Sequence, residues 1–193
     1  MKTIFDFTVS LIALIILFIP FLIIALLIKL LMPGPVFFIQ ERIGKNGSSF
    51  KLFKFRTMKV ANGKSSGSFD AGDNSRITSF GGFLRKYKID ELPQIINVLF
   101  ANMSFVGPRP EVRKWTEVYP EKWQIVHSVK PGITDNASIE FRNEEIILSQ
   151  SLDPIKTYKE VILPRKLELY IEYVNTRSFW GDIGIILKTL KVL

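Results

Sequence analysis

The chain of 193 residues has no cysteine and a single histidine, His127. The lack of cysteine excludes disulfides and thiolate metal sites. One histidine excludes a His-rich metal cluster and argues against a Ser-His-Asp triad, so we expect His127 to be structural. There is also no internal repeat, no P-loop and no GxGxxG fingerprint. Any acid–base or nucleophilic chemistry must therefore come mainly from carboxylates, Lys, Tyr or hydroxyl groups.

Negative charge is also scarce: 18 Asp and Glu stand against 26 Lys and Arg, a net charge of +8. Such a balance suits an anionic membrane surface, phosphorylated substrates or nucleic acid, and composition does not choose among them. Hydrophobic residues make up 47% of the chain and the excess lies at the N-terminus. The length fits one compact domain plus a membrane segment.

No charged residue occurs from Phe7 to Ile28, a run of about 22 residues that is long enough to cross a bilayer as a helix. The run is longer than the apolar region of a secretory signal and has no small-residue cleavage site after it. Basic residues follow it, beginning with Lys29, so the positive-inside rule predicts that the rest of the chain is cytoplasmic.

Pro20 lies in the middle of this run, where it removes a backbone donor and clashes with the preceding turn. One alternative is a kinked helix that spans the bilayer, which the residues alone favour because Pro is common in such helices. The other is a helix–break–helix hairpin that enters and leaves through the cytoplasmic leaflet, with Lys2 and Lys29 on the same side.

After a turn at residues 32–35, the apolar residues 36–39 indicate an extended or interfacial segment. Residues 50–58 alternate as in a strand, and Lys54 and Arg56 would then point the same way, roughly 7 Å apart. That spacing suits two neighbouring phosphates, although a solvated basic strand explains it equally well. Residues 61–75, rich in Gly, Ser, Asn and Asp, indicate a long mobile loop.

Four helices are expected beyond this loop. One begins near Asp90 and runs toward Phe100, and two more cover residues 143–150 and 154–175, with Pro164 starting or kinking a turn. Residues 179–193 form either an amphipathic helix in the membrane interface or an ordinary packing helix. The predicted fold class is thus α+β, mostly helical.

The pair Asp90-Glu91 is the most informative feature. Asp is a favoured N-cap and Pro93 is tolerated in a first turn, so both carboxylates are expected at a helix N-terminus, which favours anions. Such an aspartate could attack phosphorus, and Glu91 could position or deprotonate an acceptor or help to bind Mg²⁺. Taken alone, the pair is an ordinary capping arrangement.

Basic residues flank this pair in the sequence. Arg85 and Lys88 precede it, and Arg109 follows in a turn between Pro108 and Pro110. The prolines restrict the backbone, so Arg109 would be held with little loss of entropy, and its planar fork matches phosphate oxygens.

Five motifs in a fixed order give a resemblance along almost the whole chain. They are GPVFFIQERIGKNG (34–47), FKLFKFRTM (50–58), RITSFGGFLRKYKIDELPQIINVL (76–99), MSFVGPRPE (103–111) and KPGIT (130–134). The chain resembles the monotopic phosphoglycosyl transferases, the bacterial sugar transferases, in a small form consisting of the catalytic core only. The resemblance implies a re-entrant membrane-anchoring helix over residues 1–32, broken near Pro20, and an interfacial catalytic domain over residues 33–193.

The resemblance also implies an activity. It is the transfer of a sugar phosphate from a UDP-sugar to undecaprenyl phosphate, with Mg²⁺ as cofactor and UMP as product. Asp90 corresponds to the nucleophile that forms a covalent phospho-sugar, and Glu91 to its partner carboxylate; either could bind the metal. Lys54, Arg56, Arg85, Arg109 and Pro110 correspond to substrate contacts.

The expected location is the cytoplasmic face of the bacterial inner membrane, in contact with membrane lipids. The expected partners exclude nucleic acid and include a second copy of the chain or downstream glycosyltransferases.

Three departures from the family pattern stand out: residues 100–102, residues 135–138 and Ile19, where a Ser often precedes the Pro. The first two concern the choice of sugar and the third concerns the backbone at the break. Three other functions remain alternatives. In the first, Asp90 and Glu91 bind only Mg²⁺ and transfer is direct; in the second, the protein is a non-catalytic basic membrane-tethered module; the third is a nucleotide-sugar hydrolase.

Overall fold

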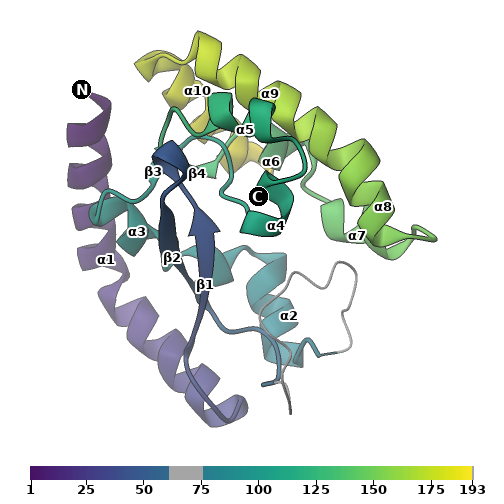
Figure 1. Ribbon diagram of the computed structural model, residues 1–193. Coiled ribbons are helices and arrows are strands. Elements are labelled where there is room, and N and C mark those ends of the chain that lie inside the picture. Colours follow the sequence, from purple (N-terminus) through teal and green to yellow (C-terminus); the bar gives the residue numbers. More distant parts are fainter. Residues whose placement is uncertain (61–75, 193) are drawn as a thin grey trace.

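The computed structural model describes residues 1–60 and 76–192, and the predicted loop at 61–75 lies outside them. As predicted, the fold is α+β and mostly helical; its strands form two small sheets (Figure 1). The helices are α1 (Lys2–Leu31), α2 (Ser79–Lys86), α3 (Gln94–Leu99), α4 (Arg113–Thr116), α5 (Pro120–Val126), α6 (Asn136–Glu140), α7 (Glu144–Ser149), α8 (Pro154–Thr157), α9 (Leu163–Thr176) and α10 (Phe179–Val192). The strands are β1 (Phe37–Ile43), β2 (Ser49–Phe55), β3 (Ser104–Val106) and β4 (Gly132–Thr134).

The apolar run forms one helix, α1, which continues on both sides of Pro20. The backbone is therefore not interrupted there, since a helix interior can absorb the single donor that Pro removes. A window of 18 residues has a mean hydropathy of 3.4 and is only 6% buried, which is the exposure expected of a helix in contact with lipid. The chain is thus membrane-associated through α1, and re-entry into one leaflet stays a prediction.

Both ends of α1 contact the rest of the protein, and Figure 1 shows the helix running along one side of it. Near the N-terminus, Lys2 Nζ donates to Val106 O at 2.9 Å and binds the Asp182 carboxylate. Near the C-terminus, Ile28 and Met32 are buried against Phe55 and Leu84. The helix is therefore held at both ends as part of one folded unit.

The predicted extended segment and strand are confirmed as an antiparallel hairpin, in which β1 and β2 pair from Phe37–Phe55 to Ile43–Ser49. The strand prediction over residues 50–58 was too long, because β2 ends at Phe55. Directly after it, Arg56 N still donates to Val36 O at 2.9 Å.

The second sheet pairs β3 with β4 in parallel through a very close backbone approach. A Cβ added to Gly132 would lie 2.1 Å from Gly107 N, and one added to Gly107 would lie 2.6 Å from Lys130 O. Only glycine allows this contact, which joins the segment before the Pro108–Pro110 turn to β4.

The C-terminal half forms the main core, under α9 and around α5 (Figure 1). The helices predicted at 143–150 and 154–175 are confirmed as α7 and as a continuous helical run from α8 to α9. A π-helical turn, Tyr158–Ile162, comes directly before Pro164 in the first turn of α9. The wider turn lets the helix continue although Pro164 has no backbone N–H to donate.

The C-terminal prediction is confirmed as helix α10, which has two different faces. Asp182 and Ile185 are buried, and Ile185 packs with Val106 and Tyr173. Trp180 and Leu190 on the same helix are 78% and 63% exposed. The helix therefore packs with one face and presents a large apolar surface with the other.

Candidate active site

Asp90 does not cap a helix, which corrects the prediction from its sequence context. It lies in a 3₁₀ turn, Ile89–Glu91, and α3 begins only at Gln94 with Pro93 as its N-cap. The turn starts at Lys88, which adopts the left-handed conformation with φ of 54°. A non-glycine residue in this region is strained, and here the strained residue turns the chain so that Asp90 becomes buried.

Asp90 as a residue is 7% exposed, and its Oδ1 is buried without a hydrogen-bond partner. Burial raises its pKa to about 6, because desolvation disfavours the charged form. Lys54, Arg85 and Lys88 oppose this change by attraction, while Glu91 adds to it by repulsion. Asp90 thus has a free oxygen and titrates close to neutral pH, as expected of a group at a functional site.

Glu91 is bound by two cations from distant parts of the chain. Arg109 contacts both of its oxygens, with Nη1 to Oε2 at 3.1 Å, and Lys54 Nζ lies 2.9 Å from Oε1. Burial would raise the pKa of Glu91, but Arg109 and Lys54 hold it well below its usual range. Glu91 is therefore a permanent carboxylate and a weak base, and it fixes the positions of the two cations.

Arg85 also lies close enough to Asp90 to attract its carboxylate. Its Nε donates to Thr57 Oγ1 at 3.1 Å, and its Nη1 binds Glu145 on the exposed side at 3.2 Å. The structure thus gathers Lys54, Arg85, Lys88 and Arg109 around the two carboxylates. More positive than negative charge surrounds the free oxygen of Asp90, and this surplus favours a phosphorylated ligand.

Arg56 lies outside this cluster, contrary to the prediction that it accompanies Lys54. Its guanidinium donates to the carbonyl oxygens of Met32 and Pro33, at 2.9 Å for Pro33. These carbonyls follow the end of α1 and lack helical partners, so Arg56 satisfies them and ties the helix to β2.

Arg42 and Glu111 brace the turn that carries Arg109, and the sequence did not single them out. Arg42 Nη1 donates to Pro110 O at 3.0 Å and to Glu111 Oε2 at 3.2 Å, and Ile43 N donates to Glu111 O at 2.9 Å. Tyr158 Oη donates to Glu111 Oε1 at 2.6 Å. Both residues lie inside motifs, but only the fold brings β1, the turn and the segment before α9 together.

A magnesium ion fits part of this site. Within residues 1–60 and 76–192 no group of three or more His, Asp or Glu side chains could hold a metal. Mg²⁺ commonly rests on one or two carboxylates plus substrate phosphates, and the unpartnered Oδ1 of Asp90 meets that need. Glu91 does not fit equally well, because its oxygens already accept from Arg109 and Lys54.

Fold and site together describe a membrane-associated protein with a buried carboxyl that lies among several cationic side chains. All 193 residues match the family described as bacterial sugar transferase, and the chain belongs to that family. It is 36% identical over 191 residues to an uncharacterized sugar transferase of Bacillus subtilis strain 168, with 99% of this chain and 86% of the relative covered.

Two longer relatives have named activities. A UDP-glucose:undecaprenyl-phosphate glucose-1-phosphate transferase of Escherichia coli K12 is 39% identical over 171 residues, which is 86% of this chain and 34% of the relative. An N-acetylgalactosaminephosphotransferase of Aeromonas hydrophila, which uses the UDP-sugar and undecaprenyl phosphate, is 34% identical over 172 residues, or 88% and 38% of the two chains. The chain thus spans about a third of the length of these relatives.

Proposed function

We propose that the protein transfers a sugar phosphate from a UDP-sugar to undecaprenyl phosphate and releases UMP. The observation that carries the proposal is the buried, unpartnered Oδ1 of Asp90 beside the cationic group of Lys54, Arg85 and Arg109. Relatives that align with 86% and 88% of this chain bear names with the same type of activity. Transfer from a diphosphate needs both the cations and the carboxylate, because the cations bind its oxygens and a free carboxylate can attack phosphorus.

In the proposed reaction the Asp90 carboxylate attacks the sugar-linked phosphorus of the donor. A bond forms between its oxygen and phosphorus, the bond between the two phosphates breaks, and UMP leaves with the bonding electrons. The phosphate oxygen of the lipid acceptor then attacks the same phosphorus and displaces Asp90, which returns as a free carboxylate. Both steps bring negative groups together, and Lys54, Arg85 and Arg109 offset their repulsion.

Glu91 has a positioning role in this scheme. Its contacts with Arg109 and Lys54 hold two cations side by side, and its low pKa makes it unsuited to accept a proton. Bound Mg²⁺ would neutralise charge on the phosphates, and Asp90 is the residue that would hold it. UDP-sugar and undecaprenyl phosphate are the proposed partners, and the sugar is left open.

We also propose that α1 enters and leaves the cytoplasmic leaflet of the bacterial inner membrane. A straight helix of 30 residues is about 45 Å long, enough to place its ends on opposite sides of a bilayer. Instead Lys2 and Asp6 at one end, and Met32 at the other, contact the same domain. This arrangement supports a shallow anchor, which would bring a lipid-linked acceptor to a domain at the membrane surface.

A UMP-release assay tests the function. The full chain in lipid nanodiscs is incubated with a panel of UDP-sugars, with and without undecaprenyl phosphate. We expect a sugar-phosphate lipid and UMP with one or a few of the sugars, and loss of both with Asp90→Asn. Asp153→Asn is a matched control, because Asp153 caps α8 on the surface and Asn caps equally well.

The same assay separates the mechanisms. A covalent phospho-sugar on Asp90 predicts that labelled UMP exchanges into UDP-sugar without acceptor, and direct transfer predicts no exchange. Steady UMP release without lipid identifies a hydrolase instead. A protein that releases no UMP under any condition would contradict the proposed function.

A further inference from the structure

The first turns of α1 hold β3, the strand that leads into the Pro108–Pro110 turn. Lys2 Nζ donates to Val106 O at 2.9 Å, and Asp6 Oδ1 accepts from Phe105 N at 3.3 Å. Residues four apart lie on the same face of a helix, so one face of α1 binds two adjacent residues of the strand. The strand ends at Val106, and the chain continues directly into the turn.

Lys2 supplies a hydrogen bond to Val106 O that Tyr173 cannot supply without leaving another partner. Tyr173 Oη lies 3.1 Å from this oxygen, but it is closer to Asp182 Oδ1, at 2.9 Å, and a phenol has one proton to donate. Burial and the Asp182 carboxylate raise the pKa of Tyr173, so the phenol keeps that proton. The three protons of the Lys2 ammonium serve Val106 O, Tyr173 Oη and the carboxylate. Without Lys2, Tyr173 could donate to Val106 O only by giving up its bond to the carboxylate.

The place of Lys2 in its own helix also indicates a specific role. A positive charge at the start of a helix is unfavourable, because the helix dipole puts partial positive charge there. Asp182 lies in the first turn of α10, where its negative charge is favourable. The N-terminal ends of α1 and α10 therefore meet beside β3, and Lys2 is stabilised by Asp182 and Val106 O rather than by its own helix.

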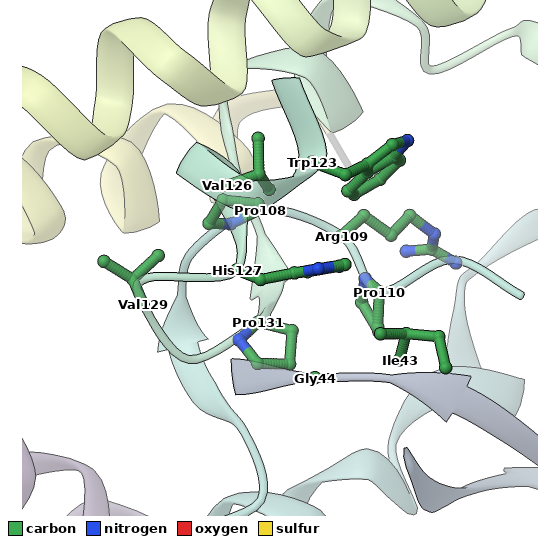
Figure 2. Close-up of a pocket in the computed structure, with 10 residues that line it drawn as sticks. All are labelled: Ile43, Gly44, Pro108, Arg109, Pro110, Trp123, Val126, His127, Val129 and Pro131. Atoms are coloured by element: carbon green, nitrogen blue, oxygen red, sulfur yellow. The ribbon is translucent and has the colours of Figure 1, made fainter. Parts of the chain in front are cut away.

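The turn that carries Arg109 is held by the segments before and after it. Before it, β3 pairs with β4, and after it Arg42 Nη1 donates to Pro110 O at 3.0 Å. Figure 2 shows Arg109 where the turn passes between α5 and the end of β1, and there the residue borders a small hollow. The position of Arg109 thus depends on the segments on either side, and a shift of β3 would carry its guanidinium away from Glu91.

We propose that Lys2 and Asp6 are positioning residues for Arg109. By seating the first turns of α1 on β3, they hold the turn in the place from which Arg109 binds the diphosphate of the donor. The inference rests on the proposed function and assigns part of the donor affinity to the N-terminal end of the membrane helix. A protein in which this end of α1 is displaced would keep both carboxylates of the site and bind the donor weakly.

The test measures binding of UDP to the full chain in nanodiscs by calorimetry. Lys2→Met keeps the apolar part of the side chain and removes the donors, so UDP affinity should fall about 5- to 20-fold. Lys2→Arg keeps the charge and the donors and should retain most of the affinity. A purely structural role of Lys2 would lower stability and leave the affinity of the folded protein unchanged. Lys29→Met, at an exposed position near the other end of α1, is the matched control and should bind UDP like the wild type.

Arg109→Gln tests whether Lys2 acts through Arg109. In that background Lys2→Met should change UDP affinity less than about twofold, because the side chain that Lys2 positions is gone. Equal fold-changes in the two backgrounds would show that Lys2 acts by another route and would overturn the inference.

Asp6→Ala provides a second route if Lys2→Met does not fold. It removes the acceptor of Phe105 N and leaves the pair of Lys2 and Asp182 intact. UDP affinity should fall in this variant, whereas Asp6→Asn keeps an oxygen that can accept from Phe105 N and should bind UDP like the wild type. Unchanged UDP affinity in the folded Lys2→Met and Asp6→Ala variants, in a protein that still transfers sugar phosphate, overturns the positioning role and leaves the proposed function intact. A wild-type protein that neither binds UDP nor transfers removes both.

Discussion

At the scale of single residues, the environment of Asp90 links its reactivity to stability. Burial raises its pKa from 3.8 to about 6. Between these values the folded state holds more protons than the unfolded state, so stability falls as pH rises from about 4 to about 6. The same carboxyl must be ionised to attack phosphorus. The residue proposed as nucleophile therefore destabilises the fold at the pH where it works.

Asp90→Asn should accordingly be more stable than wild type at pH 7, by about 1–3 kcal/mol, and inactive. The difference should shrink as pH falls to 4, because wild-type Asp90 then becomes neutral too. Urea denaturation of the two proteins at pH 4, 5, 6 and 7 measures this. Equal stability at all four values would show that Asp90 is not buried as a charged group.

Glu91 has the opposite effect, since its charge is compensated on two sides. Glu91→Gln leaves Lys54 and Arg109 without their counter-charge in a buried place, and we expect a loss of about 2–4 kcal/mol in the free energy of unfolding. The exposed pair of Glu140 and Arg165 is the control, and Glu140→Gln should change stability very little. Similar losses for both variants would contradict the role of Glu91 as the buried counter-charge of Lys54 and Arg109.

At the scale of elements, Asn97 connects α3 to β2 and so places Asp90 near Lys54. Its Nδ2 donates to Lys51 O at 2.7 Å, its Oδ1 accepts from Phe53 N at 3.1 Å, and the side chain is fully buried. Asn97→Ala leaves two backbone groups of a strand without partners, and each unsatisfied group costs about 1–3 kcal/mol. We expect a loss of about 2–4 kcal/mol and a fall in UMP release, measured by denaturation and by initial rate. Asn143→Ala is the control, because Asn143 makes no side-chain cap bond at the start of α7; an equal loss in that variant would contradict the role of Asn97.

The elements that the sequence predicted well depend on local signals. Continuous apolar residues predict α1, and the alternation over residues 50–58 predicts the strand that the structure shows as β2. Pro164 also marked a real irregularity, the π-helical turn before α9. In each case the deciding interactions lie within a few residues of one another, so a single stretch of chain contains the information.

The features that the sequence did not predict depend on distant partners. From the sequence Arg56 resembles a phosphate ligand, but in the fold α1 brings the carbonyls of Met32 and Pro33 to it. From the sequence Asp90 resembles an N-cap, but in the fold it lies in a 3₁₀ turn that begins at the left-handed Lys88 and precedes α3. Arg42 and Glu111 become a brace only when β1 meets the Pro108–Pro110 turn. The spacing of these residues along the chain does not indicate their contacts.

At the scale of the whole molecule, α1 decides how the protein meets the membrane. Its N-terminal end is held by Lys2, which binds Asp182 of α10 and Val106 O. The exposed Trp180 and Leu190 of α10 lie on the helix that this contact secures. A spanning α1 would have to break the Lys2 and Asp6 contacts and leave the Asp182 carboxylate, 6% exposed, without its cation. These contacts are the reason for the proposal that both ends of α1 stay on one side of the bilayer.

The absence of cysteine allows a direct test of this topology, because a single introduced thiol is unique in the chain. Thr3→Cys and Lys29→Cys place thiols at exposed positions near the two ends of α1, and Gln124→Cys marks the catalytic domain. In inverted and right-side-out membrane vesicles, a membrane-impermeant maleimide should label all three from the cytoplasmic side. Labelling of Thr3→Cys only from the opposite side would establish a spanning helix. In that case the Lys2 and Asp6 contacts would be broken and contacts of other residues would replace them. Lys2→Ala would then change neither activity nor stability.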